Sequence, residues 1–530
     1  MFPRGFRFFS RAARGEQPAD QPADQPATDT PPVLQLNWLS LGGTFLAILG
    51  LFIAIFTFLL DLLSGESQAY TGLLYMLYLG LMMFGLSLVP VGMFLERRRR
   101  STGAGPSLPS GLVINFHNAS HRATLFTVLA IASLILLVVV VGSNKVYQAT
   151  ETNAFCGQVC HTVMEPEFTA YQYSSHARVH CVECHIGTGS EWYVKSKISG
   201  IRQIFAVLGN TFPRPIPTPI HDLRPARETC EQCHWPKKFI GYKDVVRNYY
   251  MSDEENTPHR IRMLMKIGGE EHALMRGSGI HYHMLLSGKV EYIARDQKRQ
   301  DIAWVRITHN DRTSETFEDS DNPLSEEDKK GLEVRTMDCM DCHNRPSHQL
   351  PTPMRLVNQA MEVGDISRAL PKIKEQSVRA LSETYANEIA AMEGIQKYLL
   401  NFYGEEYPAL RESLAVQLLG SVEAVQTIYK RSVFPEMNAS WKSYPDNIGH
   451  RDFPGCFRCH NDRLQNEASE TIFTTCNKCH LILAQGESVD RVESDLIEGL
   501  SFVHPGEDGE DISEYTECTE CHTGGPDVYD

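Results

Sequence analysis

The chain has 530 residues, with 50 Lys and Arg against 65 Asp and Glu, and a formal net charge of −15 at pH 7. This length exceeds the usual size of one domain. The acidic balance argues against nucleic acid as a partner, because a polyanion is repelled by a surface of the same sign.

Residues 1–36 predict a disordered cytoplasmic tail. The start is basic, and it is followed by a repeated QPAD segment and a proline-rich stretch that ends at Pro32. Such a composition cannot bury enough apolar surface to fold. No apolar run directly follows the basic start, so we do not expect a cleavable signal peptide.

Three apolar runs then predict a three-helix membrane anchor over residues 37–143. Each is near the length of a helix that crosses a bilayer, and they cover about Leu41 to Leu63, Thr71 to Leu95 and Ala123 to Gly142. The basic cluster Arg97 to Arg100 lies between the second and third runs, whereas the loop around Glu66 has no basic residue. The positive-inside rule therefore places the N-terminus in the cytoplasm and the chain from about Ser143 in the periplasm, which predicts a protein of the bacterial inner membrane.

All 14 cysteines lie in pairs that are followed directly by histidine. Three residues separate the cysteines of the first pair, and two separate those of each other pair. The seven motifs are Cys156/Cys160/His161, Cys181/Cys184/His185, Cys230/Cys233/His234, Cys339/Cys342/His343, Cys456/Cys459/His460, Cys476/Cys479/His480 and Cys518/Cys521/His522. Two such cysteines hold a c-type haem through thioether bonds, and the next histidine binds its iron. Zinc or disulfides also use cysteine pairs, but the histidine after every pair favours seven covalent haems.

The periplasmic part divides by motif spacing into a first haem domain (144–245, haems one to three), a β-containing insertion (246–335) and a C-terminal haem domain (336–530, haems four to seven). Val290 to Asp296 and Ile302 to His309 read as strands, because β-branched and aromatic residues are enriched there. Between motifs four and five, Pro353 to Arg431 has helical periodicity, with the apolar residues Leu370, Leu381, Ile389, Leu399 and Leu418. The predicted fold class is mostly α: three transmembrane helices followed by a multihaem c-type cytochrome domain with a small β insertion.

Histidines outside the motifs supply candidates for the second axial ligand of each iron. His176, His348 and His450 lie just outside a haem motif, where a ligand to a neighbouring haem is expected. Weaker candidates are His221, His281, His283, His504 and His259, whereas His180, His272 and His309 are expected to be structural or on the surface. Two imidazoles lower the potential of an iron relative to a His/Met pair, so this ligation would suit a low-potential relay.

Four stretches carry a family resemblance: FCGQVCHTVMEP, SSHARVHCVECH, WYVKSKISG and LRPARETCEQCHWP. Over about Cys156 to Lys238 the chain resembles the NapC/NirT family of membrane quinol dehydrogenases. The resemblance implies that quinol from the membrane pool is oxidised near the first haem. It further implies that periplasmic cytochromes or reductases accept the electrons, in anaerobic or metal-reducing respiration.

The resemblance also implies residues for the quinol site. Met164 matches the family methionine that replaces the motif histidine as ligand of the first haem, although here two residues rather than one separate it from His161. A core methionine packed on the porphyrin is the alternative. Lys195 and Lys197 match the stretch whose lysine lies near the quinol oxygen, with contact to lipid headgroups as the alternative. Arg202 and Gln203 occupy the place of an acidic residue found in some relatives, so the proton acceptor is unassigned.

Two other functions remain open at this point. A terminal reductase would leave one iron without a second ligand and reduce nitrite, hydroxylamine or a sulfur oxyanion there. A relay subunit would use the helices only to join a larger respiratory complex, and oligomerisation is compatible with any of these functions.

Overall fold

The computed structural model describes most of the chain. The described part comprises residues 37–64, 71–103, 119–159, 161–187, 190–220, 224–235, 238–271, 276–285, 289–309, 311–472, 475–505 and 517–529. The predicted disordered tail and the candidate ligand His221 lie outside it. The chain separates into two compact units, Met1–Val138 and Val139–Asp530.

The first unit contains two long helices, α1 (Trp38–Ser64) and α2 (Thr71–Ser101), which pack closely on one another. Glycines permit the contact: a Cβ at Gly43 would lie 2.7 Å from the carbonyl oxygen of Gly85, and one at Gly85 would lie 2.5 Å from the amide of Ala47. Small residues allow this close approach of backbones where lipid offers no hydrophobic drive for helix association.

The described residues hold two helices long and apolar enough to cross a membrane, rather than the three predicted. These spans are Trp38–Thr57 and Gly80–Ser101. The third predicted run lies in helix α3 (Ala119–Thr150), which continues from the first unit into the second. Many of its apolar side chains fall outside the described residues.

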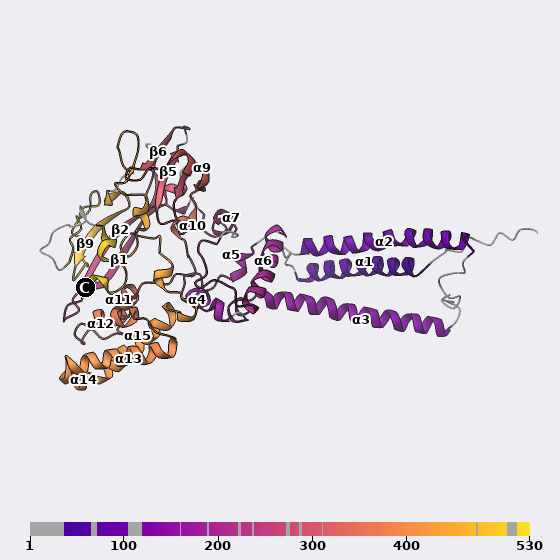
Figure 1. The fold of residues 1–530 in the computed structure, drawn as a ribbon, viewed down its shortest axis with the longest axis horizontal. Helices are drawn as coiled ribbons and strands as arrows, with labels where there is room; N and C mark the ends of the chain where they lie inside the picture. The colour runs from indigo at the N-terminus through magenta and orange to yellow at the C-terminus, as the bar shows by residue number, and fades with distance from the viewer. Residues whose placement is uncertain are drawn as a thin grey trace, which may run out of the picture. The chain divides into compact units, whose positions relative to one another are not determined.

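The second unit is helical over much of its described length (Figure 1). After a π-helical turn, η1 (Phe155–Val159), come α4 (His161–Gln172), α5 (Cys181–His185), α6 (Ser190–Leu208), α7 (Ala226–Cys230), α8 (Tyr282–Leu285), α9 (Glu326–Gly331), α10 (Cys339–Cys342), α11 (Pro353–Val363), α12 (Ile373–Ser382), α13 (Glu388–Glu405), α14 (Pro408–Ser413), α15 (Ala415–Ser432) and α16 (Cys518–Cys521). Short 3-10 turns are η3 (Pro435–Met437), η4 (Trp441–Ser443), η5 (Gly455–Arg458), η6 (Cys476–Lys478) and η8 (Pro526–Tyr529).

Helices α11, α12, α13 and α15 form the main hydrophobic core, and together with α14 they confirm the predicted helical spacer. Thr352 caps the start of α11 through its side chain, Pro353 begins the helix, and Gly364 ends it in the left-handed conformation. Four of the five apolar residues that carried the prediction are buried in this core: Leu370, Leu381, Leu399 and Leu418. Ile389 is helical, as predicted, but it is 73% exposed because it lies on the solvent side of the first turn of α13.

Two antiparallel sheets complete the second unit. One has the order β1-β2-β3 with β9 also paired to β2, and it consists of β1 (Gly241–Tyr250), β2 (Pro258–Glu271), β3 (Arg276–Ser278) and β9 (His480–Gly486). The other has the order β7-β4-β5-β6-β8, formed by β4 (Lys289–Ala294), β5 (Ile302–Thr308), β6 (Ser314–Asp319), β7 (Arg335–Thr336) and β8 (Leu464–Gln465).

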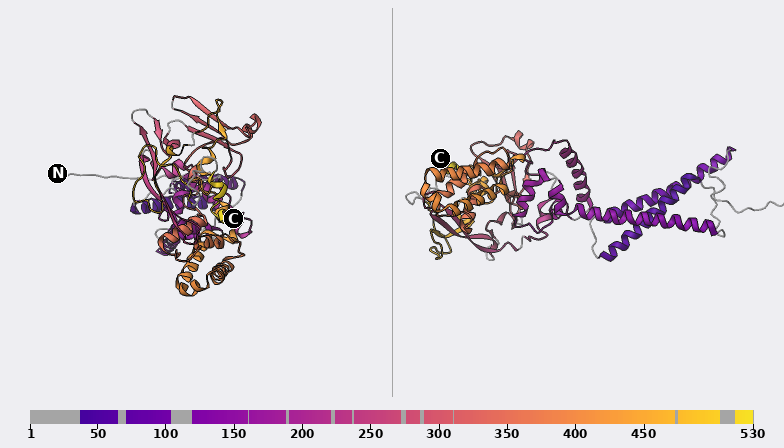
Figure 2. Two further views of the ribbon diagram at one scale, coloured as in Figure 1. Left: turned by 90° about the vertical axis from the view of Figure 1, so that its left-hand side faces the viewer. Right: turned by 90° about the horizontal axis from the view of Figure 1, so that it is seen from below.

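Strands β4 and β5 confirm the two predicted strands and pair with each other, Tyr292 opposite Val305. The β1–β2 hairpin was not predicted. Because β8 and β9 come from the region after the fifth motif, the sheets draw on residues well beyond 246–335. Within this unit, β5 and β6 lie at the opposite end from α13 and α14 (Figures 1 and 2).

Candidate functional site

Six motif histidines each face a second histidine from elsewhere in the chain. The distances between ring centres fall between 5.9 and 6.4 Å. The pairs are His185 with His348, His234 with His176, His343 with His281, His460 with His283, His480 with His450, and His522 with His504. The seventh motif histidine, His161, begins α4, and its side chain and Cys160 lie outside the described residues.

This spacing fits an iron held between two imidazoles. An imidazole nitrogen lies about 2.0–2.1 Å from a first-row metal ion, so two imidazoles on opposite sides of one ion have ring centres about 6.3 Å apart. The six pairs therefore have the separation that axial ligation of a haem iron requires.

Hydrogen bonds orient several of the second histidines. The Nδ1 atom of His348 lies 2.9 Å from the carbonyl oxygen of Glu167, and that of His281 lies 3.0 Å from the carbonyl oxygen of Ile267. An Nδ1–H that donates to a carbonyl leaves Nε2 as the lone-pair nitrogen that can bind a metal. Backbone contacts thus set the ring orientation that ligation needs.

Burial favours the neutral form, which binds metals, in several of the paired histidines. It lowers the pKa of His185 to about 4, with the facing His348 acting in the same direction. It likewise lowers the pKa of His283 and of His480 to about 4. An imidazole that stays neutral at pH 7 is ready to donate its lone pair.

The weaker candidate His259 has other surroundings, as do His180 and His309, which were expected to be structural or on the surface. His259 lies near His504, and its Nε2 is buried without a hydrogen-bond partner among the described residues. His309 lies 3.4 Å from Glu315 in an ion pair, and His180 is exposed at the start of α5. None of these three is paired with a motif histidine in the described ring contacts.

The first motif has its extra residue in the π-helical turn η1. A π-turn absorbs a one-residue insertion into a helix, and such turns are frequent at functional sites. Gly157 is buried under the ring of Phe168 from α4; a Cβ there would lie 2.2 Å from a ring carbon. The longer cysteine spacing is therefore accommodated by a specific local packing.

Lys197, from α6, lies beside the first motif. Its Nζ is 2.5 Å from Oε1 of Glu151 and lies over the rings of Tyr193 and Tyr147. The charges of both Lys197 and Glu151 act on the thiol of Cys156. Sequence reasoning missed Glu151, because a single acid after an apolar run gains meaning only once α6 packs against it.

The other two predicted residues of this site are placed differently. Lys195 has its Nζ over the ring of Trp192, at 4.6 Å, on the same helix. Met164 is half-buried on α4, one turn after His161. Of the two candidate lysines, Lys197 thus contacts the surroundings of the first motif.

Cysteines of successive motifs lie near one another in chain order. Cys156 lies close to Cys181, and Cys230 lies close to Cys339. The remaining steps bring cysteines close enough to interact electrostatically: Cys184 with Cys233, Cys342 with Cys456, Cys456 with Cys479, and Cys476 with Cys518. The attachment sites therefore follow one another in space as they do in sequence.

Arg458 joins the fourth and fifth motifs. This buried guanidinium donates to the carbonyl oxygens of Gly455 (2.8 Å), Arg299 (2.7 Å) and Asp341 (2.8 Å). Asp341 lies between the cysteines of the fourth motif, and its carboxylate accepts from Tyr292 and Arg335. The arrangement fixes two attachment sites relative to each other through backbone contacts.

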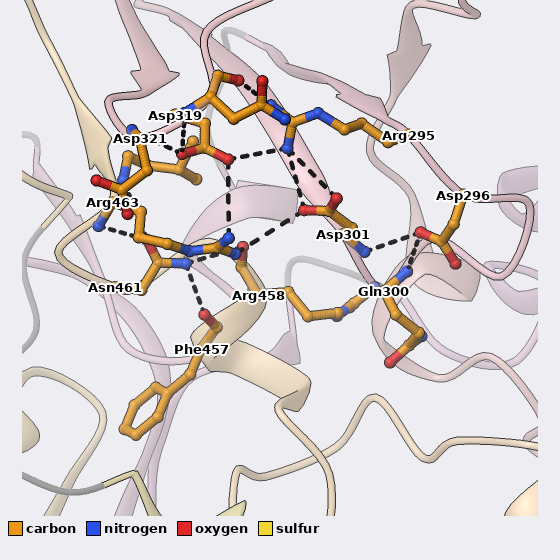
Figure 3. Close-up of polar contacts among 12 residues, drawn as sticks. Arg295, Asp296, Gln300, Asp301, Asp319, Asp321, Phe457, Arg458, Asn461 and Arg463 are labelled. Atoms are coloured by element: carbon orange, nitrogen blue, oxygen red, sulfur yellow. Dashed lines mark hydrogen bonds and ion pairs between the residues drawn. The ribbon is translucent and has the colours of Figure 1, made fainter.

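A polar network beside Arg458 fastens the fifth motif to the sheet (Figure 3). Asp319 on β6 binds Arg295 at 2.8 Å and lies 3.7 Å from Arg463. Burial acts to raise the pKa of Asp319, but the hydrogen bonds from Arg295 and two backbone amides hold it below its ordinary value. Asn461, directly after the motif, accepts from the amide of Arg463 and so links the motif to this network.

Apolar spanning helices, haem-attachment motifs and facing histidines together define a membrane-anchored multihaem c-type cytochrome. The chain belongs to the NapC/NirT cytochrome c family. The model of the N-terminal region of that family matches residues 118–215, which cover α3, the first two motifs and α6.

Two relatives extend the comparison. The chain is 40% identical over 480 residues to the cytochrome c-type protein ImcH of Geobacter sulfurreducens, covering 89% of this chain and 92% of that protein. It is 29% identical over 129 residues to the cytochrome c-type protein NrfH of Wolinella succinogenes, covering 24% of this chain and 72% of that one. No solved structure matches the chain.

Proposed function

We propose that this protein holds seven c-type haems, oxidises quinol beside its first motif and passes the electrons to periplasmic acceptors. The observation that carries the proposal is the Lys197–Glu151 pair, 2.5 Å apart and next to Cys156. An ammonium and a carboxylate at the entry point of a cytochrome are the two groups that quinol deprotonation needs.

Membrane topology supports access for a lipid-soluble substrate. In this proposal α3 is a third crossing, the N-terminus is cytoplasmic and the second unit is periplasmic. Glu151 follows directly after the last residue of α3, and Cys156 is five residues further along the chain. The first attachment site would therefore lie near the outer surface of the inner membrane, within reach of the quinone pool.

The proposed reaction balances two protons and two electrons per quinol. As the first O–H proton leaves, the Lys197 ammonium stabilises the oxygen anion, and the Glu151 carboxylate accepts that proton. The second proton passes to water on the periplasmic side. When bound, ferric c-type haem supplies the one-electron acceptor that takes the two electrons in turn.

The facing histidines and the order of the cysteines support a relay beyond the first site. We assign His176, His348, His281, His283, His450 and His504 as the second axial ligands of the six motifs they face, and Met164 as the candidate ligand for the first. Because the attachment sites follow one another in chain order, we expect electrons to enter at the first motif and to leave at the seventh, which lies close to the C-terminus.

The histidine pairs also bear on the terminal-reductase alternative. Direct reduction of nitrite or a similar substrate requires an iron with one open position. Among the six motifs whose histidine side chains are described, each has a second imidazole opposite. This arrangement favours electron relay to a separate protein.

The test is anaerobic mixing of the detergent-solubilised holoprotein with a reduced menaquinol analogue, following haem absorbance. We expect rapid reduction of the wild type and, by analogy with the loss of an oxyanion-stabilising donor, a rate about 10²-fold lower in Lys197→Ala. Lys195→Ala is the matched control and should stay near the wild-type rate. If dithionite reduces the wild type but quinol does not, the relay-subunit alternative replaces this proposal.

A further inference from the structure

Helix α6 exposes a continuous apolar stripe. Five of its residues recur at intervals of three and four, which places them on one helix face. Their exposed fractions run from 36% to 77%, and they are Val194, Ile198, Ile201, Phe205 and Leu208, with Ile204 at the edge of the stripe. A run of large exposed apolar side chains on one face marks a surface that another apolar phase covers.

The flanks of the stripe have the composition of a bilayer interface. Lys195 and Arg202 lie along one side and are exposed, where long basic side chains can reach lipid phosphates. Trp192 and Tyr193 lie in the first turns of the same helix, and Tyr147, near the end of α3, is 6.1 Å from Tyr193 between ring centres. Trp and Tyr are enriched at the level of the headgroups.

Contacts at the N-terminal half of α6 tie it to the end of α3. The Lys197–Glu151 ion pair and the Tyr147–Tyr193 contact join the two segments within the second unit. The family model that matches the chain also covers both of them. The exposed stripe therefore begins next to the segment at which the chain passes from apolar helix to haem motifs.

We infer that α6 lies flat in the outer membrane–water interface, with its apolar stripe buried among lipid acyl chains. Lys195 and Arg202 then face anionic headgroups, and the Lys197–Glu151 pair lies at headgroup depth. A second copy of the chain fits the stripe less well, because two stripes packed antiparallel about a two-fold axis would also bring their basic flanks together. The inference does not depend on quinol oxidation and would stand if another subunit performed that reaction.

The test places the photo-crosslinking residue p-benzoylphenylalanine at single positions of α6 in the haem-loaded protein. The protein is reconstituted in nanodiscs of phosphatidylethanolamine and phosphatidylglycerol and irradiated. Adducts are then identified by mass spectrometry. Ile201 and Phe205 report on the stripe, and the exposed Gln203 is the matched control on another face of the same helix.

Lipid adducts at Ile201 and Phe205, several-fold more abundant than at Gln203, are the expected result. Equal adduct formation at all three positions, or no lipid adduct at either stripe position, would overturn the inference. Crosslinks from the stripe to a second copy of the chain would also overturn it and identify a dimer contact instead. Using two stripe positions keeps the test valid if one variant fails to mature.

Discussion

His281 and His283 lie two residues apart in the chain but face different motif histidines, His343 and His460. Their segment therefore stands between the fourth and fifth attachment sites, which Arg458 also holds together. Ring centres are 6.4 Å apart in the first pair and 5.9 Å apart in the second. One short segment can thus complete two neighbouring iron sites.

Replacing either histidine should change one haem, and a different one in each case. On the proposed ligand assignment, His281→Met and His283→Met should each convert one bis-histidine site into a His/Met site of higher potential, since thioether ligation raises the potential. The double variant should show two changed sites. A redox titration followed by electron paramagnetic resonance measures how many haems have changed and the potential of each.

His309→Ala is the control for these variants, because His309 pairs with Glu315 and faces no motif histidine in the described ring contacts. Its redox titration should match the wild type. Identical changes in His281→Met and His283→Met would contradict the assignment of the two residues to separate motifs.

The packing of Gly157 predicts a second outcome. Gly157→Ala puts a methyl group against the ring of Phe168, and overpacking of this kind costs about 1–3 kcal/mol. The π-turn should open, and a fraction of the protein should lack the first haem. Intact-mass measurement counts the haems on each chain.

Gly420→Ala provides the matched control, since Gly420 lies in α15 with no atom within 4 Å of an added Cβ. It should carry a full set of haems and gain up to about 1 kcal/mol of stability from helix propensity. The smaller side chain at position 168 in the double variant Gly157→Ala/Phe168→Leu should make room for the methyl group and restore the first haem. If the single variant Gly157→Ala carries the full number of haems, the ring of Phe168 does not constrain the turn.

Local patterns were the part of the molecule that the sequence predicted well. The haem motifs, strands β4 and β5 and the helices between the fourth and fifth motifs depend on spacing within a few residues. The β1–β2 hairpin was not predicted, because β1 is largely exposed and carries Lys243, Asp244 and Arg247, which leaves only a weak alternation of apolar and polar residues. The exposure of Ile389 could not be predicted either, because a position in a helix does not by itself show which face of the helix packs against the core.

Long-range partners could not be predicted from spacing. His348 faces the second motif although it follows the fourth, and His176 faces the third although it precedes the second. Proximity to a motif in sequence identified these histidines as ligand candidates, but the choice of iron depends on how the chain folds back. The relation of Glu151 to Lys197 has the same origin, since 46 residues separate them.

Removing the guanidinium of Arg458 should loosen the fourth and fifth motifs together. Arg458→Met removes the donor to the carbonyl oxygens of Gly455 and Arg299, at a cost of about 1–3 kcal/mol for each buried group, while that of Asp341 keeps its hydrogen bond from the side chain of Asn447. We expect proteolysis between the two motifs to begin at a clearly lower temperature. Arg458→Lys should be intermediate, because one ammonium cannot reproduce the fork of donors.

Arg463→Met is the control for this prediction. Arg463 is about half exposed and makes its ion pairs at 3.7 and 3.9 Å, so its loss should change stability by about 1 kcal/mol or less. If Arg458→Met resists proteolysis as well as Arg463→Met does, the buried contacts of Arg458 are not what holds the two motifs.

Glu151→Gln tests the proton acceptor. The amide keeps a hydrogen bond to Lys197 but cannot take a proton, so quinol oxidation should slow by about 10²-fold or more while haem spectra stay unchanged. Stopped-flow reduction by a menaquinol analogue gives the rate. Glu183→Gln is the control, because Glu183 is an exposed acid on α5 outside the Lys197 contact.

A double variant separates a joint role from two independent ones. If Glu151 and Lys197 act on the same proton, Glu151→Gln/Lys197→Ala should oxidise quinol no more slowly than the slower single variant, because the effects of residues that act as a unit do not add. Multiplicative losses would assign the two residues to separate steps. A wild-type rate for Glu151→Gln would place the proton acceptor elsewhere and leave Lys197 with an electrostatic role alone.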